Sequence, residues 1–274
     1  MIWNFELHAN DVFLGGFPKS GTTWMQEMLW LLKNQLNFQR ALEEDLMQRV
    51  NGLDLSGFIT EKPIKSIEIC NRQKSARVIK SHLPVNLLPK QLWEKKSKTI
   101  YLARNVKDVI VSSYHFYHNL GAWNITMDEY VQNFIADRVL YAPYWQHIID
   151  FWRLRHEPNI FFVTYEELKR DLASVIQRLC DFLERPLLNE LEMKAILKHL
   201  SFEHMKGSSQ LCSVGCKKRN LLFEIFFCRF LRRGIVGSYK EELSAGNQRL
   251  LNEWTLESLA KHGIKEEDIF GKLE

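Results

Sequence analysis

The chain has 274 residues and a formal net charge of +4, with 46% hydrophobic and 26% charged residues. These values describe an ordinary globular protein, and so mild a charge excludes the strongly basic class of nucleic-acid-binding proteins. No stretch reaches the ~18 apolar residues of a membrane span, and the first residues lack the pattern of a signal peptide. We therefore expect no nucleic-acid partner and no membrane partner.

Cysteine usage indicates the compartment. The chain contains five scattered cysteines, and an odd, unclustered set argues against a disulfide framework and for a reducing, cytoplasmic location. Cys212 and Cys216 follow His199 and His204, but their spacing matches no familiar zinc pattern. We therefore expect no metal.

Short apolar runs alternate with longer helical patterns along the chain. This alternation predicts the α/β class, with a single domain over residues 1–274 and a central, mostly parallel sheet flanked by helices. The least readable stretches are 37–77 and 207–229. Strands are predicted at 11–17, 77–80, 99–103 and 159–164, and helices at 22–35, directly after 103, and at 168–183, 188–199 and 247–262.

The octet F-P-K-S-G-T-T-W at residues 17–24 has a predicted strand behind it and a predicted helix ahead. Gly21 lets the backbone curl around a ligand, and the helix start offers unpaired N–H groups to an anion. The lysine precedes the glycine, unlike the order in the common triphosphatase loop. The alternative is an ordinary strand–helix turn. Donors for phosphate oxygens would come from Lys19, Ser20, Thr22 and Thr23.

The octet resembles the phosphosulfate-binding loop of the cytosolic sulfotransferase family, Y/F-P-K-S-G-T-T-W. This resemblance implies the sulfotransferase fold, with a P-loop-like phosphate-binding turn and 3′-phosphoadenylyl sulfate (PAPS) as co-substrate. Trp24 would then stack on the adenine. The 5′-phosphosulfate would be held by Lys19, Ser20, Gly21, Thr22 and Thr23.

A second motif, K-S-H-L-P at residues 80–84, follows the second predicted strand. An imidazole titrates near neutral pH and can take a proton from a hydroxyl, and a neighbouring lysine can stabilise a transferring anion. A lone histidine is more often structural. The motif resembles the family's K-[ST]-H-L-P, which implies that His82 is the general base and that Lys80 and Lys19 stabilise the sulfuryl group.

A third motif places Arg104 at the end of the predicted strand 99–103 and Ser112 two helical turns further on. The planar guanidinium suits a phosphate, although the alternative is a surface pair with Asp108. The segment resembles the family's [AV]-R-N-x-K-D-x-x-V-S, which implies that Arg104 and Ser112 bind the 3′-phosphate.

Three further segments occur in family order, the first two being the weaker ones. V-T-Y-E-E-L at 163–168 resembles F-x-x-Y-E-D/E-[ML], which implies that Tyr165 touches the adenine. S-F-E-H-M at 201–205 resembles S-F-x-x-M, with Phe202 as the second adenine face. F-L-R-R-G-I-V-G at 230–237 resembles F-[ML]-R-K-G-x-x-G, which would close over the 3′-phosphate. The site residues that these last two segments supply are Ser201, Phe202, Met205, Phe230, Arg232, Arg233 and Gly234.

The acceptor is the least defined partner. The resemblance implies a small, hydrophobic phenol, steroid, other alcohol or amine, but the stretch before Phe17 is short for the family. The family's dimer signature K-x-x-x-T-V-x-x-x-E is degraded between Lys240 and Arg249, so monomer and homodimer both stay open. Two alternative functions also stay open: a catalytically impaired nucleotide-binding homologue, and a nucleotide kinase, which would need a lysine after the glycines and a magnesium carboxylate.

Overall fold

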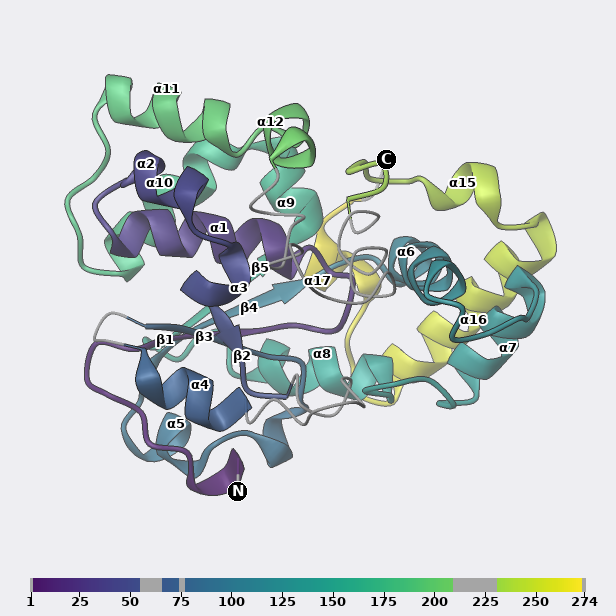
Figure 1. Cartoon of the computed structure of the whole chain (residues 1–274). Helices are drawn as coiled ribbons and strands as arrows, with labels where there is room; N and C mark the ends of the chain where they lie inside the picture. Colours follow the sequence, from purple (N-terminus) through teal and green to yellow (C-terminus); the bar gives the residue numbers. More distant parts are fainter. Residues whose placement is uncertain (1, 55–65, 74–76, 209–230, 273–274) are drawn as a thin grey trace.

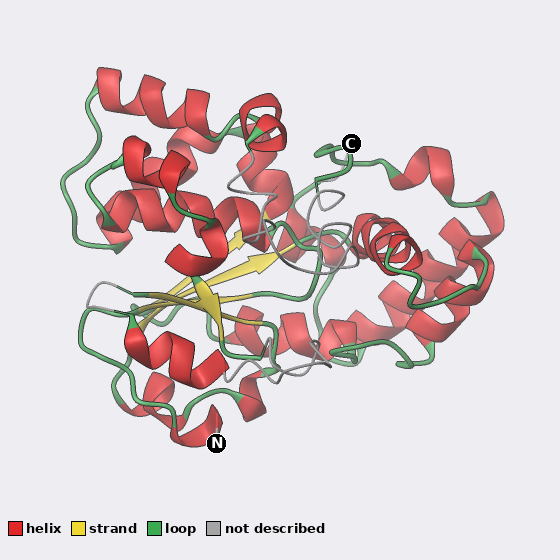
Figure 2. Ribbon diagram, in the orientation of Figure 1, coloured by secondary structure: helices red, strands yellow, loops and turns green. Residues whose placement is uncertain are grey.

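The computed structural model describes residues 2–54, 66–73, 77–208 and 231–272. Its centre is a five-stranded sheet with the order β2-β3-β1-β4-β5 (Figures 1 and 2). All four strand pairs are parallel, which confirms the predicted α/β class. The strands are β1 (Val12–Gly15), β2 (Asn51–Gly52), β3 (Val78–Ser81), β4 (Lys98–Ala103) and β5 (Ile160–Thr164).

The strand β2 is the one that the sequence did not predict. It has two residues, too few to show any periodicity, and it exists because Asn51 pairs with Ile79 at the edge of the sheet. The order places β1 between β3 and β4. Because the strands are parallel, the loops after β1, β3, β4 and β5 all leave the same edge of the sheet.

Both faces of the sheet are covered, and alternate residues of each strand enter separate cores. Val12 and Leu14 of β1 belong to one apolar cluster, whereas Phe13 between them belongs to the other. In Figure 1 α1 and α9 to α12 lie on one side of the sheet, and α4, α5 and α8 lie on the other. The helices of the first side are α1 (Thr22–Lys33), α2 (Phe38–Glu43), α3 (Leu46–Arg49), α9 (Tyr165–Arg170), α10 (Leu172–Phe182), α11 (Glu190–His199) and α12 (Phe202–Gly207).

A second group of helices lies beyond the carboxyl ends of the strands, at the right of Figure 1. Here α6 packs on α7 and α15, and α16 packs on α7, α8 and α17. The remaining helices are α4 (Ser66–Arg72), α5 (Lys90–Glu94), α6 (Val106–Asn119), α7 (Met127–Ile135), α8 (Tyr144–Arg153), α15 (Tyr239–Glu242), α16 (Ala245–Ala260) and α17 (Glu266–Phe270), with single 3₁₀ turns at Ile2–Asn4 and Val85–Leu87.

The predicted helix 168–183 is two helices. Asp171 ends α9 and caps α10, with φ −150° and ψ 81°, and its side chain accepts a hydrogen bond from the Ser174 N–H. An aspartate that caps a helix competes with continuation of the preceding one, which explains the break. The other predicted helices agree within a few residues at their ends, where Asn189 and Ser244 act as N-caps.

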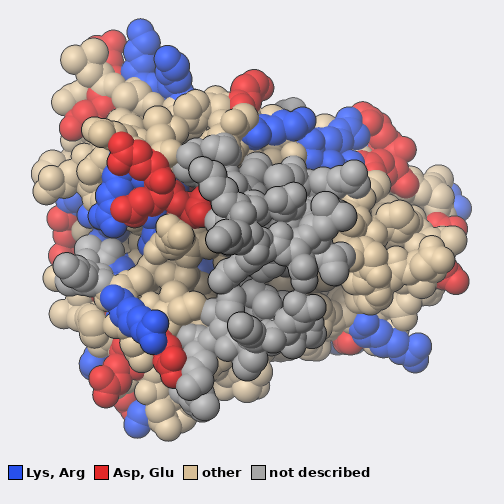
Figure 3. Space-filling model, in the orientation of Figure 1, with Lys and Arg blue, Asp and Glu red and all other residues tan. Residues whose placement is uncertain are grey.

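No helix within the described ranges combines the length and apolarity that a bilayer crossing requires. Figure 3 shows lysine and arginine side chains interspersed with acidic ones over the face that it presents.

Candidate active site

The turn between β1 and α1 has an unusual backbone. Lys19 has φ 70° and Gly21 has φ 98°, both in the left-handed region. A Cβ atom on Gly21 would lie 2.6 Å from Cδ2 of Tyr165, so this position needs glycine for its conformation and for the space. Gly21 is also the N-cap of α1 and has no side chain to cap it. The first-turn N–H groups and the positive end of the helix therefore face the turn, as in an anion site.

Ser20 and Thr22 lie beneath the turn rather than on its surface. They are 0% and 1% exposed. The buried Oγ of Ser20 has no hydrogen-bond partner among the described residues. A buried hydroxyl without a partner costs free energy, so it suits a ligand oxygen that reaches into the turn.

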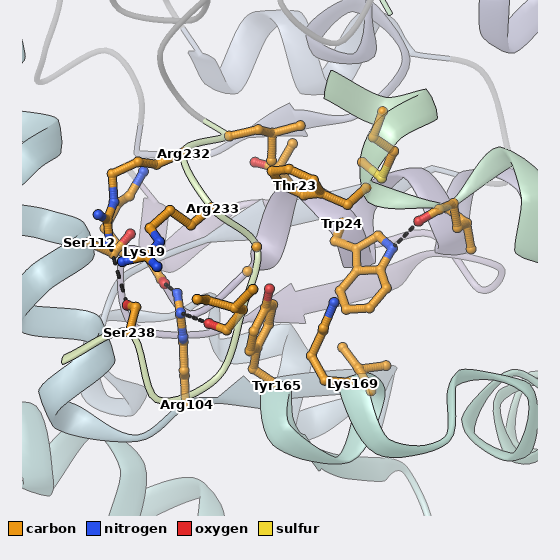
Figure 4. Close-up of a pocket in the computed structure, with 18 of the residues that line it drawn as sticks. Lys19, Thr23, Trp24, Arg104, Ser112, Tyr165, Lys169, Arg232, Arg233 and Ser238 are labelled. Carbon is orange, nitrogen blue, oxygen red and sulfur yellow. Dashed lines mark hydrogen bonds between the residues drawn. The ribbon is translucent and has the colours of Figure 1, made fainter. Parts of the chain in front are cut away.

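A pocket of about 250 Å³ opens above the turn. Figure 4 shows Lys19, Arg104, Arg232 and Ser112 at one end of the pocket, Trp24 and Lys169 at the other, and Tyr165 between Arg104 and Trp24. The pocket brings together these predicted residues: Lys19, Gly21, Thr23, Trp24, Arg104, Ser112, Tyr165, Ser201, Phe202, Met205, Arg232, Arg233 and Gly234.

The basic end is a cluster of like charges. Lys19 is 8% exposed, and its ammonium lies 4.1 Å from the centroid of the Phe116 ring. Burial lowers the pKa of Lys19 well below its usual value, and the positive charges of Lys80, Arg104 and Arg232 lower it further. Cations that lower one another's pKa repel each other, and a multiply charged anion bound between them offsets this repulsion. A polyanion is therefore the ligand that this end of the pocket favours.

Arg104 joins three parts of the pocket. It donates to the carbonyl oxygens of Lys19 at 3.1 Å and Ile235 at 3.2 Å, and its guanidinium lies 4.3 Å from the centroid of the Tyr165 ring. Its Nε has no partner within the described part of the chain. Arg104 is therefore oriented by these contacts and keeps a buried donor for a ligand.

The alternative of a surface pair between Arg104 and Asp108 is wrong. The Asp108 side chain is 0% exposed and lies 3.9 Å from the guanidinium. Its carboxylate accepts from the Gly237 N–H at 2.7 Å, the Ser238 hydroxyl at 3.0 Å and the Tyr239 N–H at 3.2 Å. Asp108 thus ties the C-terminal segment across the pocket.

That C-terminal segment supplies two further arginines. Arg232 pairs with Glu242 at 2.5 Å, and Arg233 pairs with Glu241 at 2.7 Å, so α15 holds both side chains. Gly234 has φ 65°, and a Cβ there would lie 2.2 Å from the ring of Phe202, which packs directly on its backbone. Phe230, the remaining residue predicted from this segment, lies outside the described residues.

The aromatic end is formed around Trp24. The indole N–H donates to the carbonyl oxygen of Leu200 at 2.9 Å, and the Tyr165 ring lies edge-on at 5.7 Å between centroids. The ammonium of Lys169 lies 5.6 Å from the Trp24 ring. Lys169 was not predicted from the sequence, although it lies one helical turn after Tyr165 and thus on the same face of α9. The other lining residues that were not predicted are Leu168, Leu172, Leu200, Leu231, Ile235 and Ser238.

His82 and Lys80 do not line this pocket but lie next to β1 and the turn that follows it. They are at the carboxyl end of β3, where Ser81 pairs with Gly15 of β1. The His82 Nδ1 lies 2.6 Å from the carbonyl oxygen of Gly16, at the start of the turn between β1 and α1. Because a carbonyl oxygen can only accept, Nδ1 carries the proton, and the neutral ring has its lone pair on Nε2.

The backbone of His82 is also held on both sides. Its N–H donates to the Asp54 carboxylate at 3.1 Å, and its carbonyl accepts from the Nε2 of His147 at 2.9 Å. The same Asp54 oxygen accepts from the Tyr141 hydroxyl at 2.7 Å. Among the described residues, Nε2 is therefore the one polar atom of His82 without a partner.

The charges here favour a neutral imidazole. Burial, followed by the positive charge of Lys80, lowers the pKa of His82 well below its usual value. Burial also lowers the pKa of Lys80 to about 8, although the negative charge of Asp54 opposes this. At neutral pH the imidazole of His82 is thus neutral, with a free lone pair on Nε2 that can accept a proton, and the neighbouring Lys80 is cationic.

Within the described residues, no group of three or more His, Cys, Asp or Glu side chains is placed to hold a metal ion. Cys212, Cys216 and Cys228 lie outside those residues, and Cys70 and Cys180 are free and buried.

This geometry suits a group-transfer enzyme: the pocket has a basic end that favours a polyanion and an aromatic end, and His82, beside the turn between β1 and α1, has an Nε2 without a partner among the described residues. Residues 9–263 match the family described as the sulfotransferase domain. The chain therefore belongs to the sulfotransferase family, as the loop motifs predicted, and is an enzyme of sulfuryl transfer.

Named relatives agree with this assignment. The chain is 33% identical to luciferin sulfotransferase of Photinus pyralis over 98% of this chain and 76% of that protein. It is 34% identical to sulfotransferase 1B1 of Mus musculus over 87% of this chain and 79% of that protein. Among solved structures, it resembles retinol dehydratase in complex with androsterone and the inactive cofactor PAP. The TM-score is 0.85 at 26% identity, with 97% of this chain and 85% of that chain covered.

Proposed function

We propose that this enzyme transfers the sulfuryl group of PAPS to the hydroxyl or amine of a small, hydrophobic acceptor, with His82 as the general base. The observation that carries the proposal is the connection between His82 and the phosphate-binding turn. His82 is hydrogen-bonded to Gly16, and Lys80 acts electrostatically on both His82 and Lys19. An anion bound at Lys19 would therefore lie beside a base that has its lone pair on Nε2.

PAPS fits the residues at both ends of the pocket. The unpartnered Ser20 Oγ and Arg104 Nε are buried donors for phosphate oxygens. Lys19, Ser20, Gly21, Thr22 and Thr23 would hold the 5′-phosphosulfate. The 3′-phosphate would meet Arg104, Ser112 and the backbone and guanidinium groups of 232–234, and the adenine would lie among Trp24, Tyr165 and Phe202. Retinol dehydratase, at 26% identity, was solved with PAP, the desulfated nucleotide.

The reaction needs positioning and charge stabilisation rather than covalent chemistry on the protein. His82 Nε2 takes the proton of the acceptor hydroxyl, whose oxygen attacks sulfur in line with the bridging oxygen to the 5′-phosphate. The sulfur–oxygen bond to the phosphate breaks, and adenosine 3′,5′-bisphosphate leaves. Lys19, Lys80 and Ser112 stabilise the charge that develops on the bridging and sulfuryl oxygens.

An apolar acceptor fits the rings around the proposed base. The Phe116 ring lies against the Lys19 ammonium, and the Tyr141 ring lies 5.6 Å from the His82 ring. The Phe17 ring lies 5.6 Å, between centroids, from the ring of His147, whose Nε2 donates to the His82 carbonyl. Such walls favour a phenol, a steroid or another alcohol over a strongly charged acceptor. We further propose that residues 1–274 form one catalytic domain that acts in the cytoplasm.

A transfer assay with ³⁵S-labelled PAPS and a panel of phenols, steroids, aliphatic alcohols and amines tests this function. We expect labelled product with an apolar acceptor and, with His82→Ala, product formed at least about 10²-fold more slowly. The absence of product with every acceptor class would favour the catalytically impaired homologue. The nucleotide kinase is tested by thermal shift: adenosine 3′,5′-bisphosphate should raise Tm without magnesium, and stronger stabilisation by ATP with magnesium would contradict the proposal.

A further inference from the structure

A buried polar cluster lies next to the aromatic end of the pocket, and none of the proposed catalytic steps uses it. Its centre is Glu27 of α1, which is 0% exposed. One carboxylate oxygen accepts from the Arg49 guanidinium at 2.7 Å, and the other accepts from the His199 Nε2 at 2.8 Å. Because a carboxylate has no proton to donate, the His199 Nε2 carries the hydrogen.

The two partners of Glu27 are different in kind. Arg49 compensates its charge, and Arg49 is itself held by the carbonyl oxygens of Glu44 at 2.9 Å and Ala41 at 3.3 Å. His199, in contrast, is the last residue of α11, directly before Leu200, Ser201 and Phe202, which line the pocket. The bond from Glu27 to His199 therefore ends at the segment that forms one wall of the site.

The same wall has a second link to α1. The Trp24 indole N–H donates to the Leu200 carbonyl at 2.9 Å. Trp24 and Glu27 are three residues apart and thus lie on one face of α1, while Leu200 and His199 are adjacent in the chain. Two hydrogen bonds one helical turn apart fix both the rotation of α1 about its axis and its position along that axis relative to the 199–202 segment. A single hydrogen bond would leave either the rotation or the axial position free.

We propose that Glu27 and His199 are positioning residues for the nucleotide: they hold the Leu200–Phe202 wall at the spacing from Trp24 that the adenine requires. This inference rests on the proposed function, because it presumes that the pocket binds an adenine nucleotide. The phosphate-binding turn, at the other end of the pocket, makes its own contacts through Arg104 and does not depend on this link.

A pair of variants at His199 tests the link and leaves the Glu27–Arg49 pair in place. In His199→Gln, the amide nitrogen occupies about the position of Nε2 and still donates to Glu27. In His199→Leu the volume is kept and the donor is lost. We expect calorimetry to show about tenfold weaker binding of adenosine 3′,5′-bisphosphate to His199→Leu, the effect of one buried hydrogen bond, and near wild-type binding to His199→Gln.

Arg185→Met is the matched structural control. Arg185 donates to the Leu32 carbonyl at 3.1 Å, at the far end of the same helix, so its loss removes an anchor of α1 away from the pocket. We expect Arg185→Met to lower Tm without weakening nucleotide binding. In steady-state assays His199→Leu should raise KM for PAPS and leave kcat and the acceptor KM unchanged.

Three results would overturn the proposal: wild-type nucleotide affinity in His199→Leu, equal weakening in the Leu and Gln variants, or equal weakening in Arg185→Met. If His199→Leu does not fold, His199→Met takes its place, because it also lacks a donor for Glu27 and its flexible side chain can fill the same space. Its nucleotide affinity should fall in the same way, and an unchanged affinity overturns the proposal. Failure of the wild-type protein to bind the nucleotide would instead contradict the proposed function.

Discussion

The Nδ1 atom of His82 lies 2.6 Å from the carbonyl oxygen of Gly16. This bond joins the proposed base to the first residue of the phosphate-binding turn. It also decides the tautomer of the imidazole, because the proton must lie on Nδ1 and the lone pair on Nε2. A single contact thus gives the base its position relative to the donor and its ability to accept a proton.

Loss of the imidazole should abolish catalysis and spare binding. We expect His82→Ala to lower kcat by about 10²–10⁴-fold, the usual effect of removing a general base. The affinity for adenosine 3′,5′-bisphosphate, measured by calorimetry, should change little because His82 does not line the nucleotide pocket. His156→Ala, at an exposed histidine, is the control. A kcat in His82→Ala that stays within about tenfold of the wild-type value would show that another group is the base.

The Asp54 carboxylate should act through the position of His82. Asp54→Ala removes the acceptor for the His82 N–H and the Tyr141 hydroxyl, so we expect kcat to fall about tenfold or more while KM for PAPS stays nearly constant. Asp54→Asn retains an acceptor oxygen and should lose less. Equal kinetics in both variants and the wild type would remove Asp54 from the mechanism.

The pH profile should report His82 and Lys80, two of the groups whose pKa values are shifted. His82 acts when neutral, and its pKa is lowered, so the acidic limb of kcat/KM should lie below pH 6.5, its ordinary value. Lys80 acts when charged, and its pKa in the unliganded protein is about 8, so kcat/KM for PAPS should fall as the pH rises through about 8. In Lys80→Arg the alkaline limb should move upward. An unchanged limb would assign it to another group.

Gly21 should tolerate no side chain. Gly21→Ala places a Cβ 2.6 Å from the Tyr165 ring at φ 98°, so we expect urea unfolding to show a loss of about 1–3 kcal/mol, with greatly weakened nucleotide binding. Gly263→Ala is the matched control: its φ is 67°, but nothing lies within 4 Å of its added Cβ. It carries the backbone cost alone and should bind the nucleotide normally. Normal binding by Gly21→Ala would show that the turn does not hold the phosphate.

Arg104 should distinguish nucleotides by their 3′-phosphate. Arg104→Lys keeps the charge but loses the planar fork and the stacking on Tyr165. We expect its affinity for adenosine 3′,5′-bisphosphate to fall about tenfold or more, with a smaller change for adenosine 5′-phosphate. A competition assay with both nucleotides measures this difference. Equal losses for the two would place Arg104 away from the 3′-phosphate.

The sequence by itself determined the parts of the site that are local. The octet F-P-K-S-G-T-T-W predicted a strand, a turn and a helix with an anion site at the turn. The structure has these elements, because the left-handed glycine and the helix start are properties of adjacent residues. The alternation of apolar runs and helices likewise predicted a parallel α/β sheet, since burial of both faces leaves that pattern.

Tertiary structure decided what distant residues do together. A surface pair of Asp108 with Arg104 was an open alternative from the sequence, but Asp108 is buried and holds residues 237–239, which are about 130 residues away in the chain. The two-residue strand β2 exists through its pairing with β3. No local pattern indicates that Gly16, Asp54 and His147 converge on His82. The type of chemistry is thus encoded in short motifs. The position of the proton on the His82 ring and the charge states of His82 and Lys80 depend instead on long-range contacts and burial.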